Sequence, residues 1–366
     1  MKQIFLKFTG YLALAGVWAS VQGATLFLGG YPSSLLVFDE GKGAVVDKIP
    51  LTTGLPTSIR LSNDKKTIYV VTNDHTGIEV VDVATRKVTN HFVLNTPTKR
   101  YRLNNGVTDP SGKLFYTVTI EIDKLVDHFD IGKPKYTIID LAQQKIVQTF
   151  DIPKEDEEAN AGAYGRGGFE ISTDGKYLYQ FRDKVVIFDA ADFKVIDRIE
   201  LSQPDMPGME NIGFGGQLDS IGEPGQHVSL FNSSDPYVHN RVFGVAHFDL
   251  QTRHVDFTPI GPSPAGMTGL HVAPDKKDAY TVVSTGAQGN KRCEFWHFNL
   301  STNNIVGRNE FACRTRFSFG ISGDGKKLYI YGAGFEIEVY DAATMKYEKT
   351  WDLNNDVTMG GLITLE

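Results

Sequence analysis

One short unit recurs along the chain, and this recurrence limits the folds that the chain can adopt. A strand ends in Asp or Asn, a turn of a few residues follows, and a second strand begins. The unit reads LLVFDEGKGAV, IEVVDVATRKV, YTIIDLAQQKI, VVIFDAADFKV, VAHFDLQTRHV, FWHFNLSTNNI and IEVYDAATMKY. Asp and Asn suit tight turns. The strand-ending residues are Asp39, Asp82, Asp140, Asp189, Asp249, Asn299 and Asp341.

A second repeat precedes most of these units. It is a polar turn followed by a strand, and it reads SNDKKTIYV, DPSGKLFYT, STDGKYLYQ, APDKKDAYT and SGDGKKLYI. Each unit then holds four short strands, and no segment has a convincing helical period. Four-stranded units in series are typical of a β-propeller. A β-sandwich would not repeat the same unit seven times, so we predict an all-β, seven-bladed β-propeller.

The two ends of the repeat array predict how the propeller is completed. The first unit begins at Thr25 with TLFLGGY, which matches a second strand, so blade one lacks its innermost strand. The segment GGLITLE, residues 360–366, is a spare strand at the other end. We expect the ring to be closed by this C-terminal strand pairing with blade one, which would remove an exposed sheet edge.

The first 23 residues have the layout of a secretory signal peptide. Lys2 and Lys7 precede an apolar stretch through Ala19, and Val21 and Gly23 suit a signal peptidase. The alternative, a membrane anchor, is less suitable because the apolar run is short for a bilayer. We therefore expect a signal peptide at 1–23, a propeller at 24–366, and a periplasmic or otherwise exported protein with no membrane association after cleavage.

Charge and cysteine content exclude several functions. The formal net charge is −7, whereas nucleic-acid binding needs a clustered basic excess. Two cysteines are too few for a Cys-rich zinc site, and their spacing does not match a covalent haem motif. If the hairpin around STNN turns at Asn303, Cys293 and Cys313 lie opposite each other. Opposed residues in an antiparallel pair are close enough for a disulfide, and export permits oxidation.

Long segments are expected on one face of the propeller, where strands 2 and 3 of a blade connect and where blades are linked. They cover residues 119–134, 151–167, 203–216, 232–241 and 284–292. Elaboration of one face indicates binding, although harmless insertions are the alternative. The segment at 119–134 is a loop that holds Asp123, Asp127, His128 and Asp130. These are candidate cavity or docking residues, because an imidazole beside carboxylates can exchange protons near neutral pH. A plain polar loop is the other interpretation.

The stretch YVVTNDHTGIEVVDVATRKV resembles the Tyr-Val-Thr-Asn propeller repeat family. The chain is also similar to the β subunit of quinohemoprotein amine dehydrogenase, from end to end. Four segments carry this resemblance: LFLGGYPSSLLVFD, LVDHFDIGKPKYTIID, MTGLHVAPDKKDAYTVV, and the ending GKKLYIYGAGFEIEVYDAATMKYEKTWDL with VTMGGLITLE.

The resemblance implies an exported heterotrimer that oxidises primary amines. In that family the β subunit is a seven-bladed propeller, a dihaem subunit carries haem c, and a small subunit carries a tryptophan-derived quinone. This chain would then be a subunit of an amine dehydrogenase that holds no cofactor or metal of its own, and no residue is assigned to catalysis. It would line the substrate cavity and dock the quinone and haem subunits. The alternatives are a stand-alone exported propeller that binds a protein, glycan or small molecule, and a lactonase-like hydrolase, for which no cluster of acidic and His residues is evident.

Overall fold

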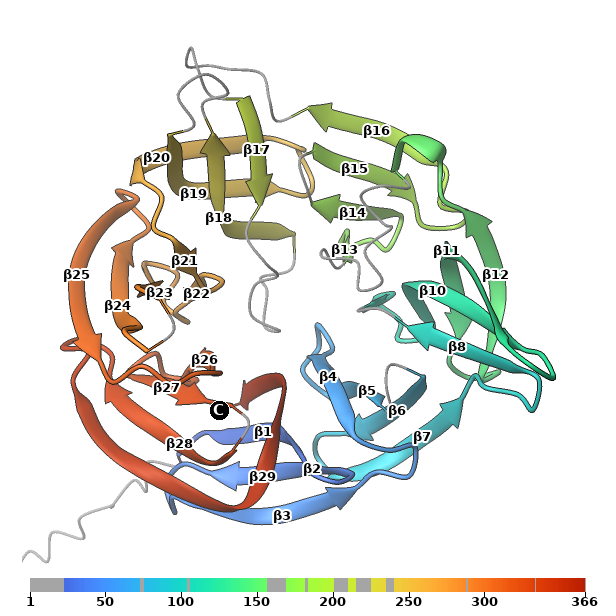
Figure 1. Cartoon of the computed structure of the whole chain (residues 1–366), viewed down its shortest axis with the longest axis horizontal. Coiled ribbons are helices and arrows are strands. Elements are labelled where there is room, and N and C mark those ends of the chain that lie inside the picture. The colour runs from blue at the N-terminus through green and yellow to red at the C-terminus, as the bar shows by residue number, and fades with distance from the viewer. Residues whose placement is uncertain are drawn as a thin grey trace, which may run out of the picture.

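β-Strands dominate the structure, a computed structural model that describes residues 23–72, 76–103, 106–156, 169–181, 184–200, 210–214, 225–234, 240–287, 289–332 and 334–365. The strands form six hydrogen-bonded sheets. Figure 1 shows these sheets arranged around a common centre, with the inner strand of each sheet nearest to it. The predicted all-β propeller fold is therefore confirmed.

Five of the sheets contain four or five strands each. The first has β4 (Pro56–Leu61), β5 (Thr67–Thr72), β6 (Gly77–Asp82) and β7 (Lys87–Val93); the second has β8 (Lys99–Leu103), β9 (Val107–Thr108), β10 (Leu114–Lys124), β11 (Phe129–Asp140) and β12 (Lys145–Asp151). The third has β13 (Phe169–Ile171), β14 (Tyr177–Phe181), β15 (Lys184–Asp189) and β16 (Val195–Glu200). The fourth has β17 (Glu210–Phe214), β18 (Gln226–Ser234), β19 (Arg241–Asp249) and β20 (Val255–Pro262); the fifth has β21 (Gly266–Met267), β22 (His271–Val272), β23 (Asp278–Thr285), β24 (Arg292–Asn299) and β25 (Asn304–Phe311).

The sixth sheet contains strands from both ends of the chain. Its order is β26 (Ser318–Ile321), β27 (Lys327–Tyr331), β28 (Gly334–Asp341), β29 (Tyr347–Leu365), β1 (Thr25–Gly30), β2 (Ser34–Asp39) and β3 (Ala44–Pro50). β29 joins the two halves because it pairs with β28 from Tyr347 onward and with β1 through Val357 and Leu362–Leu365.

The expectation of seven separate blades in a closed ring is wrong. Five sheets are separate blades, and the strands assigned to the first and last blades share one seven-stranded sheet. The C-terminal residues do lie beside Thr25–Leu28. They are, however, the end of a 19-residue strand that is common to both halves of this sheet. The described residues therefore contain no independent closing strand for a separate blade one, because the strand that pairs with β1 is the same strand that pairs with β28.

The repeated Asp or Asn ends each strand by binding the turn that follows. Asp82 Oδ1 accepts hydrogen bonds from the Thr85 backbone N–H at 2.7 Å and from the Thr85 hydroxyl at 2.6 Å. The bond from the Thr85 hydroxyl has the larger effect and the backbone bond the next. Both lower the pKa of Asp82, because they favour the charged carboxylate. Equivalent side-chain bonds are made by Asp39, Asp140, Asp189, Asp249, Asn299 and Asp341. The repeat is thus a hairpin turn held by its own side chain.

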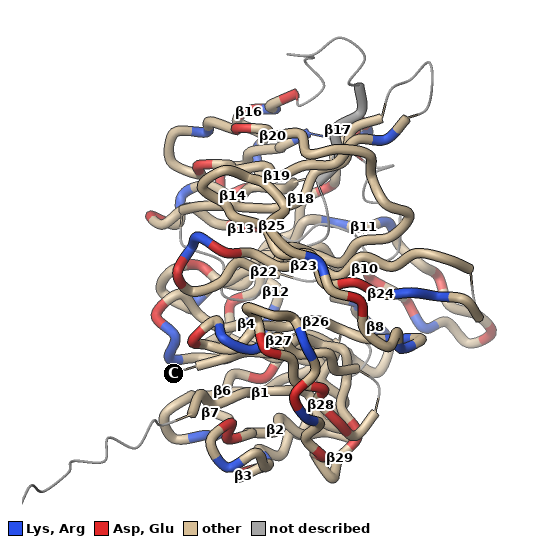
Figure 2. Tube along the Cα trace, turned by 90° about the vertical axis from the view of Figure 1, so that its left-hand side faces the viewer, with Lys and Arg blue, Asp and Glu red and all other residues tan. Residues whose placement is uncertain are grey.

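The core lies between neighbouring sheets. Phe27 and Val37 of the seven-stranded sheet pack with Ile59, Ile68 and Val81 of the β4–β7 sheet. The repeated tyrosines are buried in these layers: Tyr69, Tyr116, Tyr179, Tyr280 and Tyr329. Figure 2 shows basic and acidic residues interspersed along the surface turns. The sheets therefore act as a rigid frame, and turns and sheet ends carry the polar chemistry.

Candidate functional site

The segment expected as a loop at 119–134 is a long hairpin. β10 and β11 stay paired as far as Lys124 and Phe129, and the backbone N–H of Leu125 donates to the carbonyl of His128 at 2.9 Å. β8 pairs with the outer half of β10. The loop expectation is wrong because the alternating residues TVTIEID continue the strand pattern through the segment. We call residues 119–134 the arm; in Figure 1, β10 and β11 run together to a tip at the outer edge of the molecule.

The four candidate residues lie on the arm in two pairs. Asp127 and His128 occupy the turn, with 2.7 Å between Oδ1 and Nδ1, and both side chains are exposed. Asp123 and Asp130 are opposite each other in the ladder. Lys99 of β8 reaches Asp123, with 3.6 Å between Nζ and Oδ1. The arrangement is a charged surface rather than a convergent catalytic cluster.

Charge pairing also holds the base of the arm. Glu121 accepts a hydrogen bond from the Lys99 ammonium and another from the Tyr101 hydroxyl at 2.9 Å. The hydrogen bond from Lys99 has the largest effect on the pKa of Glu121, and it lowers that pKa. The bond from Tyr101 also lowers it, and together they outweigh the desolvation that would raise it. Both partners belong to β8, so the arm is a three-stranded extension of its sheet and not a free hairpin.

The sequence reasoning missed the apolar residues of the arm. Val126 is fully exposed, and Leu125, Phe129 and Ile131 are 51%, 65% and 67% exposed. Four large apolar side chains within seven residues of one tip form a concentrated exposed patch, which typically marks an interaction site. The signal was present in KLVDHFDI, where apolar and charged residues alternate in an insert that has no core to cover.

A second candidate site is a cavity of ≈ 400 Å³ among inner strands. The described residues that line it include no carboxylate; they are small, hydroxyl-bearing or apolar, with one arginine and one histidine. His271 packs edge-on against Phe319, with ring centres 4.7 Å apart. The lining comprises residues 57–60, Gly106, Thr268, Gly269, His271, residues 317–319, Tyr331 and residues 359–362.

The arginine that lines this cavity, Arg60, is bound by residues from other parts of the propeller. Arg60 forms an ion pair with Glu170, 3.1 Å between Nη2 and Oε2. Its Nη1 donates to the carbonyls of Gly106 at 3.1 Å and Phe169 at 3.4 Å. Arg60 comes from β4, whereas Phe169 and Glu170 belong to β13 and Gly106 directly precedes β9. Arg60 therefore connects its own sheet to β13 and to the segment that enters β9. A ligand in the cavity would therefore contact mainly hydroxyl groups and apolar side chains, because the guanidinium of Arg60 is already paired with Glu170.

The predicted disulfide between Cys293 and Cys313 is present, with 5.1 Å between the Cα atoms. The expected register is wrong by two residues. Cys293 lies opposite Phe311, because the hairpin turns between Asn299 and Asn304, earlier than expected. The earlier turn displaces the register by three residues, and the shift between His297 and Phe298 restores one of them. Cys313 reaches back from the segment that follows β25.

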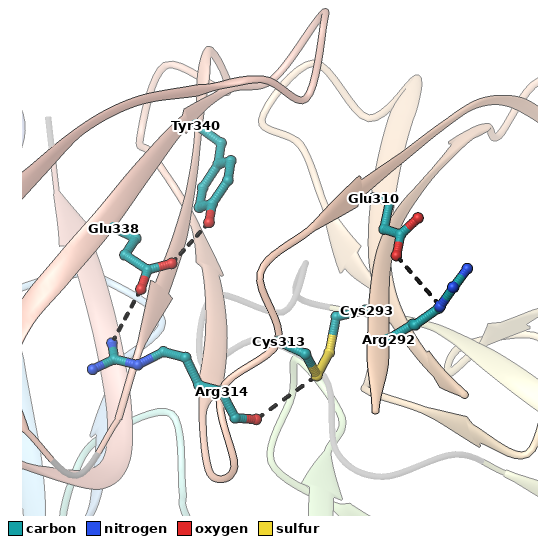
Figure 3. The surroundings of a disulfide bond; sticks show 7 residues. All are labelled: Arg292, Cys293, Glu310, Cys313, Arg314, Glu338 and Tyr340. Atoms are coloured by element: carbon teal, nitrogen blue, oxygen red, sulfur yellow. Dashed lines mark hydrogen bonds and ion pairs between the residues drawn. A yellow bond between two sulfur atoms is a disulfide. The ribbon is translucent and has the colours of Figure 1, made fainter. Parts of the chain in front are cut away.

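The disulfide belongs to a link between two sheets. Figure 3 shows Arg314, next to Cys313, pointing toward Glu338. Arg314 Nη2 is 2.8 Å from Glu336 Oε1, Nη1 is 3.8 Å from Glu338 Oε1, and the Tyr340 hydroxyl donates to Glu338 at 2.7 Å. The link continues to Phe317 in the cavity wall. The disulfide and the arginine therefore hold the chain where it enters that wall.

Other chemistry is limited in the part of the chain that the structure describes. No group of three or more His, Cys, Asp or Glu residues is placed there to hold a metal ion. Among the same residues, no helix has the length and apolar character needed to cross a membrane.

No protein-family model and no curated protein matches the chain. Solved structures do. The periplasmic gluconolactonase of Pseudomonas aeruginosa matches with a TM-score of 0.55 and 13% identity, covering 94% of this chain and 99% of the other. Apo AztD of Citrobacter koseri gives 0.54 and 13% over 94% and 98%, and the dihydro-heme d1 dehydrogenase NirN gives 0.52 and 13% over 93% and 75%. This chain is a β-propeller. At these identities the likeness shows the fold alone.

Proposed function

We propose that this propeller is an exported, non-catalytic subunit of an amine-oxidising complex, similar to the β subunit of quinohemoprotein amine dehydrogenase, and that its arm docks a partner subunit. The observation that carries the proposal is the exposed apolar tip formed by Leu125, Val126, Phe129 and Ile131. Burying one such side chain fully is worth about 1.5–3 kcal/mol. A partner that covered the tip would remove this surface from water.

The two faces of the arm differ, which suits a docking element. Opposed residues of an antiparallel pair share a face. Ile131 lies opposite Ile122 and Phe129 opposite Lys124, whereas Asp123 lies opposite Asp130 on the other face. Ile122 is buried, so the first face presents the exposed side chains of Phe129 and Ile131 beside Lys124, and the other face carries the two aspartates. Because β8 braces the arm, docking would cost little ordering entropy.

The chemistry of the partners comes from the resemblance. The Asp127–His128–Phe129 run is part of the segment that is similar to the amine dehydrogenase β subunit. We infer that a small subunit with a tryptophan-derived quinone, or a dihaem subunit with haem c, covers the tip. The cofactors would stay in those subunits, and this chain would supply surface and cavity walls.

Purification from the source organism tests the proposal. The chain should elute in a complex with a haem-bearing chain and a small quinone-bearing chain. Val126→Ser with Phe129→Ser should remove at least one partner and leave the melting temperature unchanged. Val306→Ser is the matched control, because Val306 is an exposed apolar residue of β25, outside the arm. A monomeric chain, or a complex that survives the double substitution, would contradict the proposal.

A second candidate function is a stand-alone exported propeller that binds a small molecule. The cavity of ≈ 400 Å³ favours it, since its size is within the range of small-molecule sites. The sequence also allows a protein or a glycan as the ligand of a stand-alone propeller. The cavity does not favour either of these over a small molecule. A purified monomer whose native mass exceeds the chain mass by that of one small molecule would support this function over the subunit function.

A further inference from the structure

The backbone nitrogen of Ala24 points at the carboxylate of Glu40, which has no basic side chain in hydrogen-bond contact among the residues that the structure describes. Glu40 Oε2 accepts from Ala24 N at 3.2 Å, and Ala24 O accepts from Glu40 N at 3.0 Å. The other carboxylate oxygen of Glu40 accepts from the Tyr329 hydroxyl. Glu40 follows β2 and Tyr329 belongs to β27, so the three residues connect both halves of the seven-stranded sheet.

Few charged groups lie near Glu40 in the described part of the chain. Tyr329 is buried, and the charged groups that act on Glu40 there are Asp324 and Lys349. Lys349 is held over the ring of Trp351, 4.9 Å from its centre. Burial, partly offset by the hydrogen bond from Tyr329, raises the pKa of Glu40. A cation at the position of Ala24 N would relieve this cost.

Residue 24 is also where the sequence predicts signal cleavage. We propose that the Gly23–Ala24 bond is hydrolysed and that the new α-ammonium of Ala24 pairs with Glu40, whose other carboxylate oxygen is held by Tyr329, to anchor the mature N-terminus. The C–N bond breaks, water supplies the hydroxyl of the Gly23 carboxyl group and a hydrogen to the nitrogen, and the amine takes a further proton from solvent. The catalyst would be a protease of the export machinery. This inference rests on the export part of the proposed function and is independent of its partners.

Packing determines when the cleavage takes place. Ala24 is 7% exposed. A Cβ on Gly23 would lie 2.3 Å from the backbone nitrogen of Gly41, so Gly23 itself lies directly against another segment. A protease has no access to this bond in the folded protein. Cleavage precedes the docking of β1, and the ammonium then enters its site as β1 pairs with β2.

Two measurements test the proposal. In the first, the full-length chain is exported from a bacterium, and the mass of the mature protein gives its first residue. We expect Ala24. Retention of residues 1–23, or a different first residue, would overturn the cleavage site. Co-purification of partners is a separate readout, so this result does not depend on the amine dehydrogenase assignment.

In the second, chains that begin at Ala24 and at Gly23 are released from fusions and melted at pH 7. The Ala24 form should melt higher by about 2 °C or more, and the difference should vanish when both carry Glu40→Gln. It should also shrink as pH rises above about 8, where a free α-amine loses its proton. Equal melting of the two forms, or a difference that persists with Glu40→Gln, would overturn the ion pair. Because each comparison is made within one background, a general loss of stability does not affect it.

Discussion

Cys293 lies opposite Phe311 in the β24–β25 ladder, yet it is bonded to Cys313, two residues farther along the chain. The disulfide therefore does not brace the hairpin across its register. It fixes the segment that leaves the hairpin, which continues through Arg314 to the cavity wall at Phe317. From this position the disulfide positions that segment in the folded protein, and it also reduces the conformational entropy of the unfolded chain.

Replacing both cysteines tests this role. The cysteines are separated by 20 residues, and closing a loop of that size stabilises a protein by about 3 kcal/mol in the chain-entropy model. Cys293→Ser with Cys313→Ser should lower the free energy of unfolding by about that amount in urea titrations. Thiol titration of the denatured, unreduced wild type should find no free thiol. Two reactive thiols would show that the bond does not form in solution.

The Arg60–Glu170 pair should couple sheets at the centre of the molecule. Arg60→Met would remove one donor each from the carbonyls of Gly106 and Phe169 and from the carboxylate of Glu170. We expect a loss of about 1–3 kcal/mol in urea unfolding, as for other partly buried polar groups that lose a partner. Combined with Glu170→Gln, the two losses should be less than additive. Strict additivity would mean that the two side chains do not interact in solution.

His227 should make stability depend on pH. It is buried and stacks on Phe181, with 3.9 Å between ring centres. Burial lowers the pKa of His227 to about 4. The unfolded imidazole takes up a proton near pH 6.5, so the stability is full above pH 6.5 and falls as pH decreases toward 4.

The loss over this range is at most about 3 kcal/mol. Urea midpoints measured from pH 8 to pH 4 should show it. The slope attributable to this residue should disappear in His227→Gln and remain in the control His254→Gln, which alters an exposed histidine. An unchanged slope in His227→Gln would refute the assignment.

The turn of the arm should contribute to function without contributing to stability. Asp127 and His128 are exposed and contact each other. Changing both to Ala should alter the free energy of unfolding by no more than about 0.5 kcal/mol, as expected for surface positions. It should weaken partner binding or amine turnover by the complex. If the variant unfolds readily, the pair is structural; if its complex forms and turns over normally, the site assignment is wrong.

The sequence by itself determined the elements that depend on neighbouring residues. Asp82 and its equivalents end strands because a short carboxylate can bind the next turn, and this produces a recognisable repeat. The paired cysteines were also readable, since one hairpin brings them close. These features predicted the all-β propeller class and the disulfide.

Tertiary structure decided the features that depend on strand register and on contacts between segments far apart in the sequence. The hairpin of β24 and β25 turns between Asn299 and Asn304, earlier than expected, and this leaves Cys313 beyond the end of the ladder. β29 pairs with β28 and then with β1, so two expected blades merge into one sheet. Exposure of Phe129 and Ile131 depends on whether another sheet covers them, and no local pattern encodes that. The approach of Tyr329 to Glu40, 289 residues away, exists only because β29 and β1 pair. Such contacts arise from the packing of sheets whose strands are far apart in the chain.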